Sequence, residues 1–214
     1  AAVLGLIVLF IIIKWLNSTA IVAKIRKKET KLSVSFSRYF IVLLTLSFVM
    51  QFVVTLFETV FSIYGKNELE FNSSQVGIGF MLCGSVMAAL QPVFATYGEK
   101  IMTTKQQITV GLLITGISLV VFPFLRNELS VYGLIILFAS GGAMVTPNLL
   151  SSVSLISKED TGRNISIQSS TNSIGQILGP VLGTWLLAGG FYYPFIIAGS
   201  VVLIVIGLVY YLRQ

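Results

Sequence analysis

Glu58 is the one ionisable residue that lies well inside a membrane-length apolar segment, between Tyr39 and Tyr64. A charged carboxylate at the depth of a bilayer costs several kcal/mol, about 2.5 to 3.5 on insertion scales, so acids at such positions mainly face a cavity or a partner. We therefore interpret Glu58 as a candidate for carrying a proton or meeting a ligand. The alternative is a protonated carboxyl that is hydrogen-bonded between two helices.

Polar side chains recur with helical spacing on the segment that carries Glu58. They are Ser47, Gln51, Thr55 and Ser62. Spacings of three or four residues place them on one helical face, which we expect to turn toward a cavity or a neighbouring helix. Three aromatic residues lie closest to this polar stripe, namely Phe48, Phe52 and Phe61. They are candidates for the apolar wall of a ligand site, the alternative for each ring being contact with lipid.

A second segment, residues 164–190, combines amides, glycines and a proline. Amides recur every four residues at Asn164, Gln168, Asn172 and Gln176. They predict either hydrogen bonds between helices or the lining of a water-filled path, for which we name Asn172 and Gln176. Small residues recur at the same interval, at Gly175, Gly179 and Gly183. They allow two helix backbones to approach closely, and Pro180 removes a backbone donor, which predicts a bend.

The composition places this chain among membrane proteins. Hydrophobic residues make up 55% of it and charged residues 10%, and the mean hydropathy is +0.92. A soluble domain does not have this composition. Charged residues bracket uncharged intervals that can each hold a spanning helix of about 20 residues. The fold class we predict is all-α, a polytopic transmembrane bundle with six complete helices and the end of a preceding one.

The bracketed intervals predict the organisation of the chain. We expect the end of a membrane helix at 1–16, a basic linker at 17–37 and a six-helix bundle at 38–214, with the chain a fragment of a longer one. The six helices are expected near 38–64, 74–97, 106–125, 129–157, 164–188 and 192–212. Gly189 and Gly190 supply the turn between the last two. Short connections predict that successive helices pack as antiparallel neighbours. By analogy with inverted-repeat transporter folds, the six helices would form an arrangement of three plus three.

Basic residues are concentrated in segments that would lie on one side of a membrane. They include Lys24, Arg26, Lys27, Lys28, Lys31, Lys100, Lys105, Lys158, Arg163 and Arg213. Only Lys66 and Arg126 fall on the opposite side, so the positive-inside rule predicts a multi-pass protein whose C-terminus is cytoplasmic. We interpret the net charge of +6 as a signal of topology and of contact with anionic lipid, and we expect no nucleic-acid partner.

Few residues offer conventional catalytic chemistry. Cys83 is the only cysteine and the chain has no histidine. These counts exclude an intrachain disulfide and a cysteine-based metal site. We expect no enzyme, no cofactor and no metal.

Three motifs together resemble those of a known family. They are the run from Phe57 to Tyr64, the turn Gly98-Glu99-Lys100 followed by Lys105, and the run from Gly175 to Gly183. From the end of helix six onward, the chain resembles the C-terminal half of a major facilitator superfamily transporter. Within that superfamily it is most similar to the bacterial twelve-helix drug:proton antiporters, the group that contains the NorA quinolone exporter.

The resemblance implies roles for individual residues. Glu58 matches the helix-seven acid that such exporters use for proton coupling and for meeting cationic drugs. Glu99 and Lys100 resemble a degenerate cytoplasmic gating loop that lacks the following Gly-Arg-Lys. The gating and packing motif of glycine and proline is matched by Gly175, Gly179, Pro180 and Gly183. The chain departs from the group at 143–147, where no acid precedes Pro147.

The resemblance also implies an activity. We expect proton-coupled multidrug efflux, of the kind that confers antibiotic resistance, by alternating access in the plasma membrane. The partners would be protons, small amphipathic or cationic molecules, the lipid bilayer and a missing N-terminal six-helix half. The alternatives are a transporter of a specific metabolite or lipid precursor, and an inactive or scaffolding membrane fragment.

Overall fold

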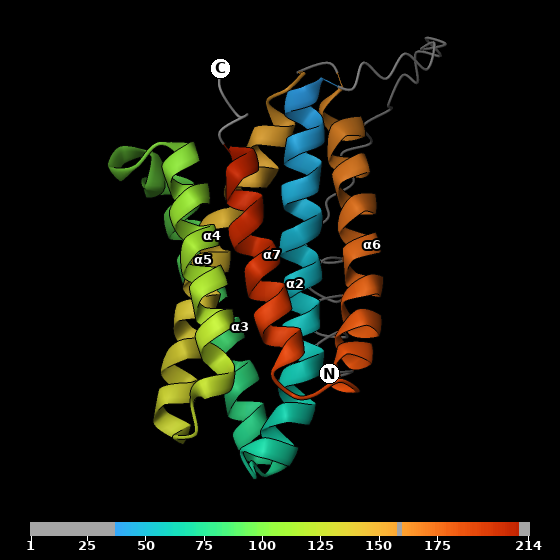
Figure 1. Cartoon of the computed structure of the whole chain (residues 1–214). Helices are drawn as coiled ribbons and strands as arrows, with labels where there is room; N and C mark the ends of the chain where they lie inside the picture. Colours follow the sequence, from blue (N-terminus) through green and yellow to red (C-terminus); the bar gives the residue numbers. More distant parts are fainter. Residues whose placement is uncertain (1–36, 158–159, 210–214) are drawn as a thin grey trace, which may run out of the picture. The chain divides into compact units, whose positions relative to one another are not determined.

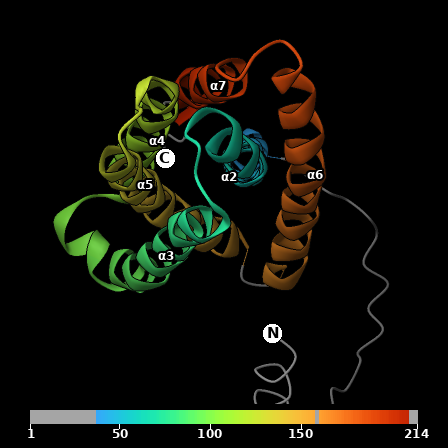
Figure 2. The same cartoon turned by 90° about the horizontal axis from the view of Figure 1, so that it is seen from below.

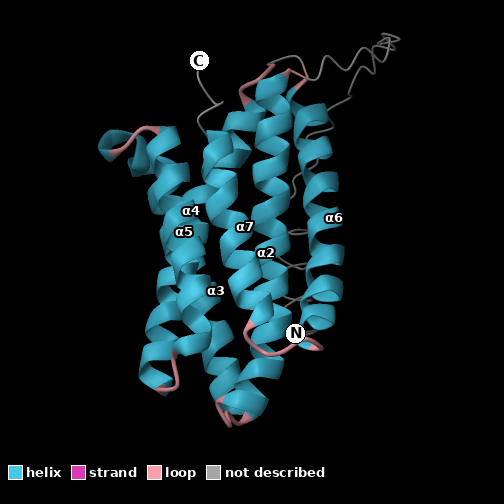
Figure 3. Cartoon of the chain, in the orientation of Figure 1, coloured by secondary structure: helices cyan, strands magenta, loops and turns pink. Residues whose placement is uncertain are grey.

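The computed structural model describes residues 37–157 and 160–209, and all regular structure within them is helical (Figures 1 and 3). The helices are α2 (Arg38–Glu68), α3 (Ser73–Ile101), α4 (Thr104–Val121), the 3-10 turn η1 (Phe122–Phe124), α5 (Glu128–Ser154), α6 (Thr161–Leu187) and α7 (Tyr193–Val209). The all-α bundle predicted from the sequence is confirmed. The predicted helix end at 1–16, and the linker up to residue 36, lie outside the described residues.

Four of these helices are long and apolar enough to cross a membrane. They are α2, α3, α4 extended by η1, and α5. The other two depart from that pattern in different ways: α6 has 27 residues but is rich in amides and hydroxyls, and α7 is apolar but has 17 residues. The sequence-based expectation of six complete spans is therefore met by length and composition in four helices.

Side chains at the helix ends explain where several helices begin. Asn72 accepts a hydrogen bond from the backbone N–H of Gln75, whose side chain accepts one from the backbone N–H of Asn72. Thr103 and Gln106 form the same capping box at the start of α4. These side chains satisfy backbone donors that a helix leaves unpaired at its first turn. Between α6 and α7 the predicted turn is present, and Gly190 adopts a φ of 139° that favours glycine.

The backbones of α2 and α6 approach each other along the glycines of α6. A Cβ atom built on Gly175 would lie 2.9 Å from the carbonyl oxygen of Phe48, and one on Gly179 would lie 2.7 Å from that of Phe52. Real Cβ atoms do not come so close, so these positions require glycine. We call the contact of Gly175, Gly179 and Gly183 with α2 the α6 glycine seam. α6 continues as a helix past Pro180.

Two further glycine contacts hold α4 between its neighbours. A Cβ atom on Gly111 would lie 2.7 Å from the carbonyl oxygen of Gly141 on α5, and one on Gly199 of α7 would lie 2.8 Å from that of Gly116. Within a membrane, lipid is as apolar as leucine, so helices associate largely through such close packing of small residues. The glycines therefore decide which helices become neighbours.

The resulting packing does not follow the order of the chain. The most extensive contacts join α2 to α6, α3 to α5, and α4 to both α5 and α7, and Figure 2 shows α2 between α6 and the group of α3, α4 and α5. Successive helices pack extensively only at α4 and α5, so the prediction of sequential neighbours is wrong for the other pairs. The bundle can be divided into two three-helix repeats in which α2 corresponds to α5, α3 to α6 and α4 to α7. The contact of α2 with α6 in this scheme corresponds to the contact of α5 with α3, as expected for such repeats.

Aromatic rings fill the core where α2, η1 and α7 meet. Phe57 and Phe61 stack with centroids 5.6 Å apart, and Phe122 stacks on Phe195 at 4.8 Å. Phe61 is fully buried and its ring lies where a Cβ atom on Gly79 would clash with it. Its predicted place in the wall of a ligand site is therefore wrong, because its helical direction leads into this core.

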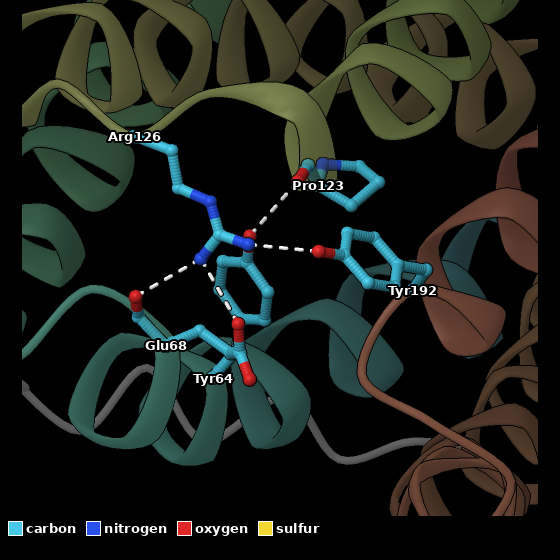
Figure 4. A network of polar contacts seen from close by, with 5 residues as sticks. All are labelled: Tyr64, Glu68, Pro123, Arg126 and Tyr192. Atoms are coloured by element: carbon cyan, nitrogen blue, oxygen red, sulfur yellow. Dashed lines mark hydrogen bonds and ion pairs between the residues drawn. The ribbon is translucent and has the colours of Figure 1, made fainter.

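A polar network closes the same end of the bundle (Figure 4). The buried Tyr64 hydroxyl donates to the carbonyl of Pro123 at 3.0 Å. Arg126 forms a 2.9 Å ion pair with Glu68 and donates at 2.8 Å to the hydroxyl of Tyr192. The hydrogen bond to Glu68 raises the pKa of the Arg126 guanidinium, so the group stays charged. The network joins the end of α2 to the α4–α5 and α6–α7 connections.

The α6 glycine seam generates a prediction about stability. Gly179→Ala should destabilise the protein by about 1 to 3 kcal/mol, because the new methyl group overpacks against the α2 backbone. Thermal unfolding in detergent, followed by circular dichroism, measures the effect. Gly162→Ala on the same helix is the matched control, since nothing lies within 4 Å of its Cβ position. Equal melting temperatures for the two variants would contradict the seam.

Candidate functional site

A polar cavity of about 140 Å³ opens between α2, α3, α5 and α6. It is lined by Ser47, Met50, Gln51, Val54, Met87, Gln91, Thr146, Leu149, Gln168 and Asn172. None of these residues is ionisable, and four of them carry amides. Two of the four helices, α2 and α3, belong to the first three-helix repeat, and α5 and α6 are their counterparts in the second. The cavity therefore lies where the two three-helix repeats meet, the place at which transporters with such repeats bind their ligands.

The volume of the cavity limits what this chain holds by itself. Pockets for drug-sized ligands have volumes of roughly 300 to 1,000 Å³, and this cavity has about 140 Å³. It can hold a polar group or a few water molecules, each of which takes about 30 Å³ in the liquid. We therefore regard it as a polar subsite that is open to a larger space.

A buried hydrogen bond in the cavity joins α6 to α2. The Gln168 side-chain amide donates to the Ser47 hydroxyl at 2.9 Å, and both residues are 4% exposed. Among residues 37–157 and 160–209, the carbonyl oxygen of Gln168 then has no hydrogen-bond partner, and neither has that of Asn172 one helical turn later. Two hydrogen-bond acceptors thus remain unpaired on the α6 side of the cavity.

Opposite α6, the polar residues of α3 and α5 each stand directly before a proline. Gln91 precedes Pro92, and Thr146 precedes Pro147. A proline within a helix cannot donate to the carbonyl four residues earlier, so the helical ladder is already interrupted at these positions. Gln91 and Thr146 are the polar lining residues that the sequence-based candidates missed, and the signal available for them was the position before a proline. Gln168 is one of the four amides for which the sequence predicted bonds between helices or the lining of a path, and it both bonds to Ser47 on α2 and lines the cavity.

Glu58 lies beside the cavity but does not line it. It follows Val54 by one helical turn, so it continues the face of α2 that lines the cavity. The side chain is exposed, and it makes no hydrogen bond or ion pair with any residue that the structure describes. It is close enough to Cys83 on α3 for the two groups to interact electrostatically. The alternative of a Glu58 carboxyl hydrogen-bonded between helices is thus not found among residues 37–157 and 160–209.

The predicted polar stripe of α2 divides between different surroundings. Ser47 and Gln51 line the cavity. Thr55 turns toward α6. Its hydroxyl donates to the carbonyl of Gln51 on its own helix at 3.0 Å and lies 3.4 Å from the carbonyl of Gly175 on α6. Ser62 is exposed and donates to its own helix. Thr55 therefore belongs to the helix contact, a fact that helical spacing alone does not reveal.

Three other predicted path residues lie away from the cavity lining. Phe48 and Phe52 are half-buried and stack on each other with centroids 6.1 Å apart, beside the α6 glycine seam. Gln176 is exposed on α6, and the only amides of that helix in the lining are Gln168 and Asn172. The structure thus brings together Ser47, Gln51 and Asn172 among the predicted path residues, and separates Phe48, Phe52 and Gln176 from them.

The turn between α3 and α4, for which gating was predicted, is held by a buried amide. The Gln107 side chain is fully buried against Gly98, donates to the carbonyl of Met102 at 3.1 Å and accepts from Asn148 at 3.0 Å. Lys100 places its ammonium group 5.2 Å from the centre of the Tyr97 ring. The side chain of Glu99 is not described, and a gating role of Glu99 and Lys100 remains a prediction.

Comparison with known proteins identifies relatives of this chain. A family model described as Major Facilitator Superfamily matches residues 67–214. The chain is also 28% identical over 175 residues to Multidrug resistance protein 2 of Bacillus subtilis (strain 168), an alignment that covers 79% of this chain and 42% of that protein. The chain thus spans about two fifths of the length of this curated relative.

The cavity generates a prediction about access by water. In a Cys83→Ser background, Gln51→Cys should react with a small hydrophilic thiol reagent because the reactive thiolate needs water around it. The rate should approach that of Glu70→Cys, the reference for an exposed position. Val60→Cys, a substitution of similar size at a fully buried position of α2, should stay unlabelled. Mass spectrometry of the labelled protein measures both. Equal labelling of Gln51→Cys and Val60→Cys would show that the cavity is closed to water.

Proposed function

Because this chain belongs to the Major Facilitator Superfamily, a family of membrane transporters, we propose that it exports amphipathic drugs in exchange for protons. The observation that carries the proposal is Glu58, a carboxylate within a membrane-length helix, one turn from a polar cavity, that makes no ion pair with the described residues. Such a carboxylate is retained in membrane helices mainly for ion or substrate pathways. The name of the Bacillus subtilis relative, Multidrug resistance protein 2, supports drugs as the substrate class.

In the proposed mechanism, this bundle rocks against a second six-helix half around the cavity. The α6 glycine seam and the Arg126 network join the helices into a unit that can move as one body. Since the cavity is smaller than a drug-sized ligand, the second half would complete the site. The same proposal places the protein in the plasma membrane with its C-terminus in the cytoplasm, on the evidence of the basic residues.

Glu58 would carry the coupled proton. A neutral carboxyl costs far less than a charged one in a low-dielectric space, so protonation changes which side of the membrane the group can face. On α5, Thr146 occupies the lining position before Pro147, where drug:proton antiporters of the resembled group have an acid. Glu58 would therefore carry the proton alone in this half, or share it with carboxylates of the other half.

A second function is favoured by the uncharged lining of the cavity. Amides and hydroxyls suit a neutral polar group, as found in a metabolite or a lipid precursor, as well as they suit a drug. Competition experiments separate the two functions. Inhibition of dye efflux by neutral polar metabolites at lower concentrations than by amphipathic drugs would favour the metabolite transporter.

Replacement of the carboxylate tests the proposed function. Glu58→Gln should reduce the pH-gradient-driven uptake of ethidium into everted membrane vesicles to the level of vesicles without the protein, because the amide cannot carry a proton. The amount of inserted protein should not change. Glu70→Gln is the matched control, since Glu70 is an exposed acid in the connection between α2 and α3. Full ethidium uptake by Glu58→Gln would refute proton coupling through this residue.

A further inference from the structure

We propose that the carbonyl oxygens of Gln168 and Asn172 select substrates that carry an N–H or O–H donor beside an apolar body. This inference rests on the proposed function, and it assigns the recognition of the substrate's polar group to two amides. It thereby separates that recognition from Glu58, which lies outside the cavity lining.

The orientation of Gln168 is the first step. Its amide nitrogen donates to Ser47 at 2.9 Å, which directs the oxygen away from Ser47. Gln168 is 4% exposed, so this oxygen can be paired only by a group that enters the cavity, either water or the polar group of a ligand. A buried acceptor without a partner is costly, and native proteins pair nearly all such atoms. An acceptor left unpaired in a cavity therefore indicates a place for a donor from outside the protein.

Another buried amide pair in this chain provides an internal comparison. Gln107 and Asn148 are both buried, and they pair with each other and with the carbonyls of Met102 and Met144. The oxygen of Gln107 and the amide nitrogens of both residues are thus paired within the protein. Gln168 and Asn172 stand one turn apart on α6, both line the cavity, and each has an oxygen that no described residue pairs. The contrast points to a binding role for the second pair.

The remaining walls define the other part of the ligand. Met50, Val54, Met87 and Leu149 supply apolar surface next to the two oxygens. Methionine side chains are flexible and polarisable, so they adapt to apolar groups of different shapes. The cavity of about 140 Å³ admits a donor-bearing group and not a whole drug. The ligand would insert its donor group here and leave its larger apolar part toward the open side.

Two fluorescent acridines that differ in their donors test the inference. Proflavine carries two aromatic amino groups, and in acridine orange these groups are dimethylated. The purified protein should bind proflavine more tightly in fluorescence titrations. Gln168→Met and Asn172→Leu should each weaken proflavine binding by about two- to tenfold, the effect of one hydrogen bond. Both should leave acridine orange binding unchanged, which also reports that the variants are folded.

Further variants separate recognition from general disturbance of α6. Gln168→Glu retains acceptor oxygens and should keep the preference for proflavine. Gln176→Met is the matched control, since Gln176 is an exposed amide of the same helix outside the cavity lining. It should change the affinity for neither dye.

The possible outcomes distinguish this inference from the proposed function. Equal affinity of the unmodified protein for the two dyes, or a preference that survives in both Gln168→Met and Asn172→Leu, would overturn the inference. Efflux of either dye that is lost in Glu58→Gln would still support the proposed function in that case. If the unmodified protein binds neither dye, the inference is overturned, and the ethidium uptake of Glu58→Gln decides the proposed function separately. If Gln168→Met fails to fold, Asn172→Leu decides the result.

Discussion

Direct contact between the backbones of α2 and α6 determines where the polar cavity lies. Gly175 and Gly179 bring α6 so close to α2 that a Cβ atom at either position would overlap backbone atoms of Phe48, Phe52 or Leu56. One and two turns before Gly175, the same helix carries Asn172 and Gln168. The contact therefore places Gln168 within hydrogen-bond distance of Ser47. Hydrophobic association is weak between helices in lipid, so close packing of this kind sets the geometry.

The other contacts of the bundle extend this constraint. Glycines of α4 meet α5 and α7, so α4 and α7 lie away from the cavity while α2, α3, α5 and α6 surround it. The two halves of the described bundle are related as three-helix repeats, and the cavity lies between them. At one end, the aromatic core and the Arg126 network join α2, η1 and the α6–α7 connection.

The arrangement separates two kinds of polar chemistry on neighbouring surfaces. Inside the cavity, uncharged amides and hydroxyls offer hydrogen bonds without the desolvation cost of a buried charge. Outside its lining, the exposed carboxylate of Glu58 continues the same face of α2. A transporter with this arrangement can hold a ligand through dipoles and carry a proton on a separate group. Coupling between the two would then act through α2, which contributes to both.

Features that are local to one helix follow from the amino-acid sequence alone. Charge spacing located the helices, and the four-residue interval of Gly175, Gly179 and Gly183 predicted a close approach, because both depend only on composition and helical periodicity. Tertiary structure decided what each face meets. Thr55 turned toward α6, Phe61 toward the aromatic core, and Gln91 and Thr146 joined the cavity from other helices. A helical wheel gives the direction of a side chain about its own axis, whereas the neighbour in that direction depends on how the other helices pack.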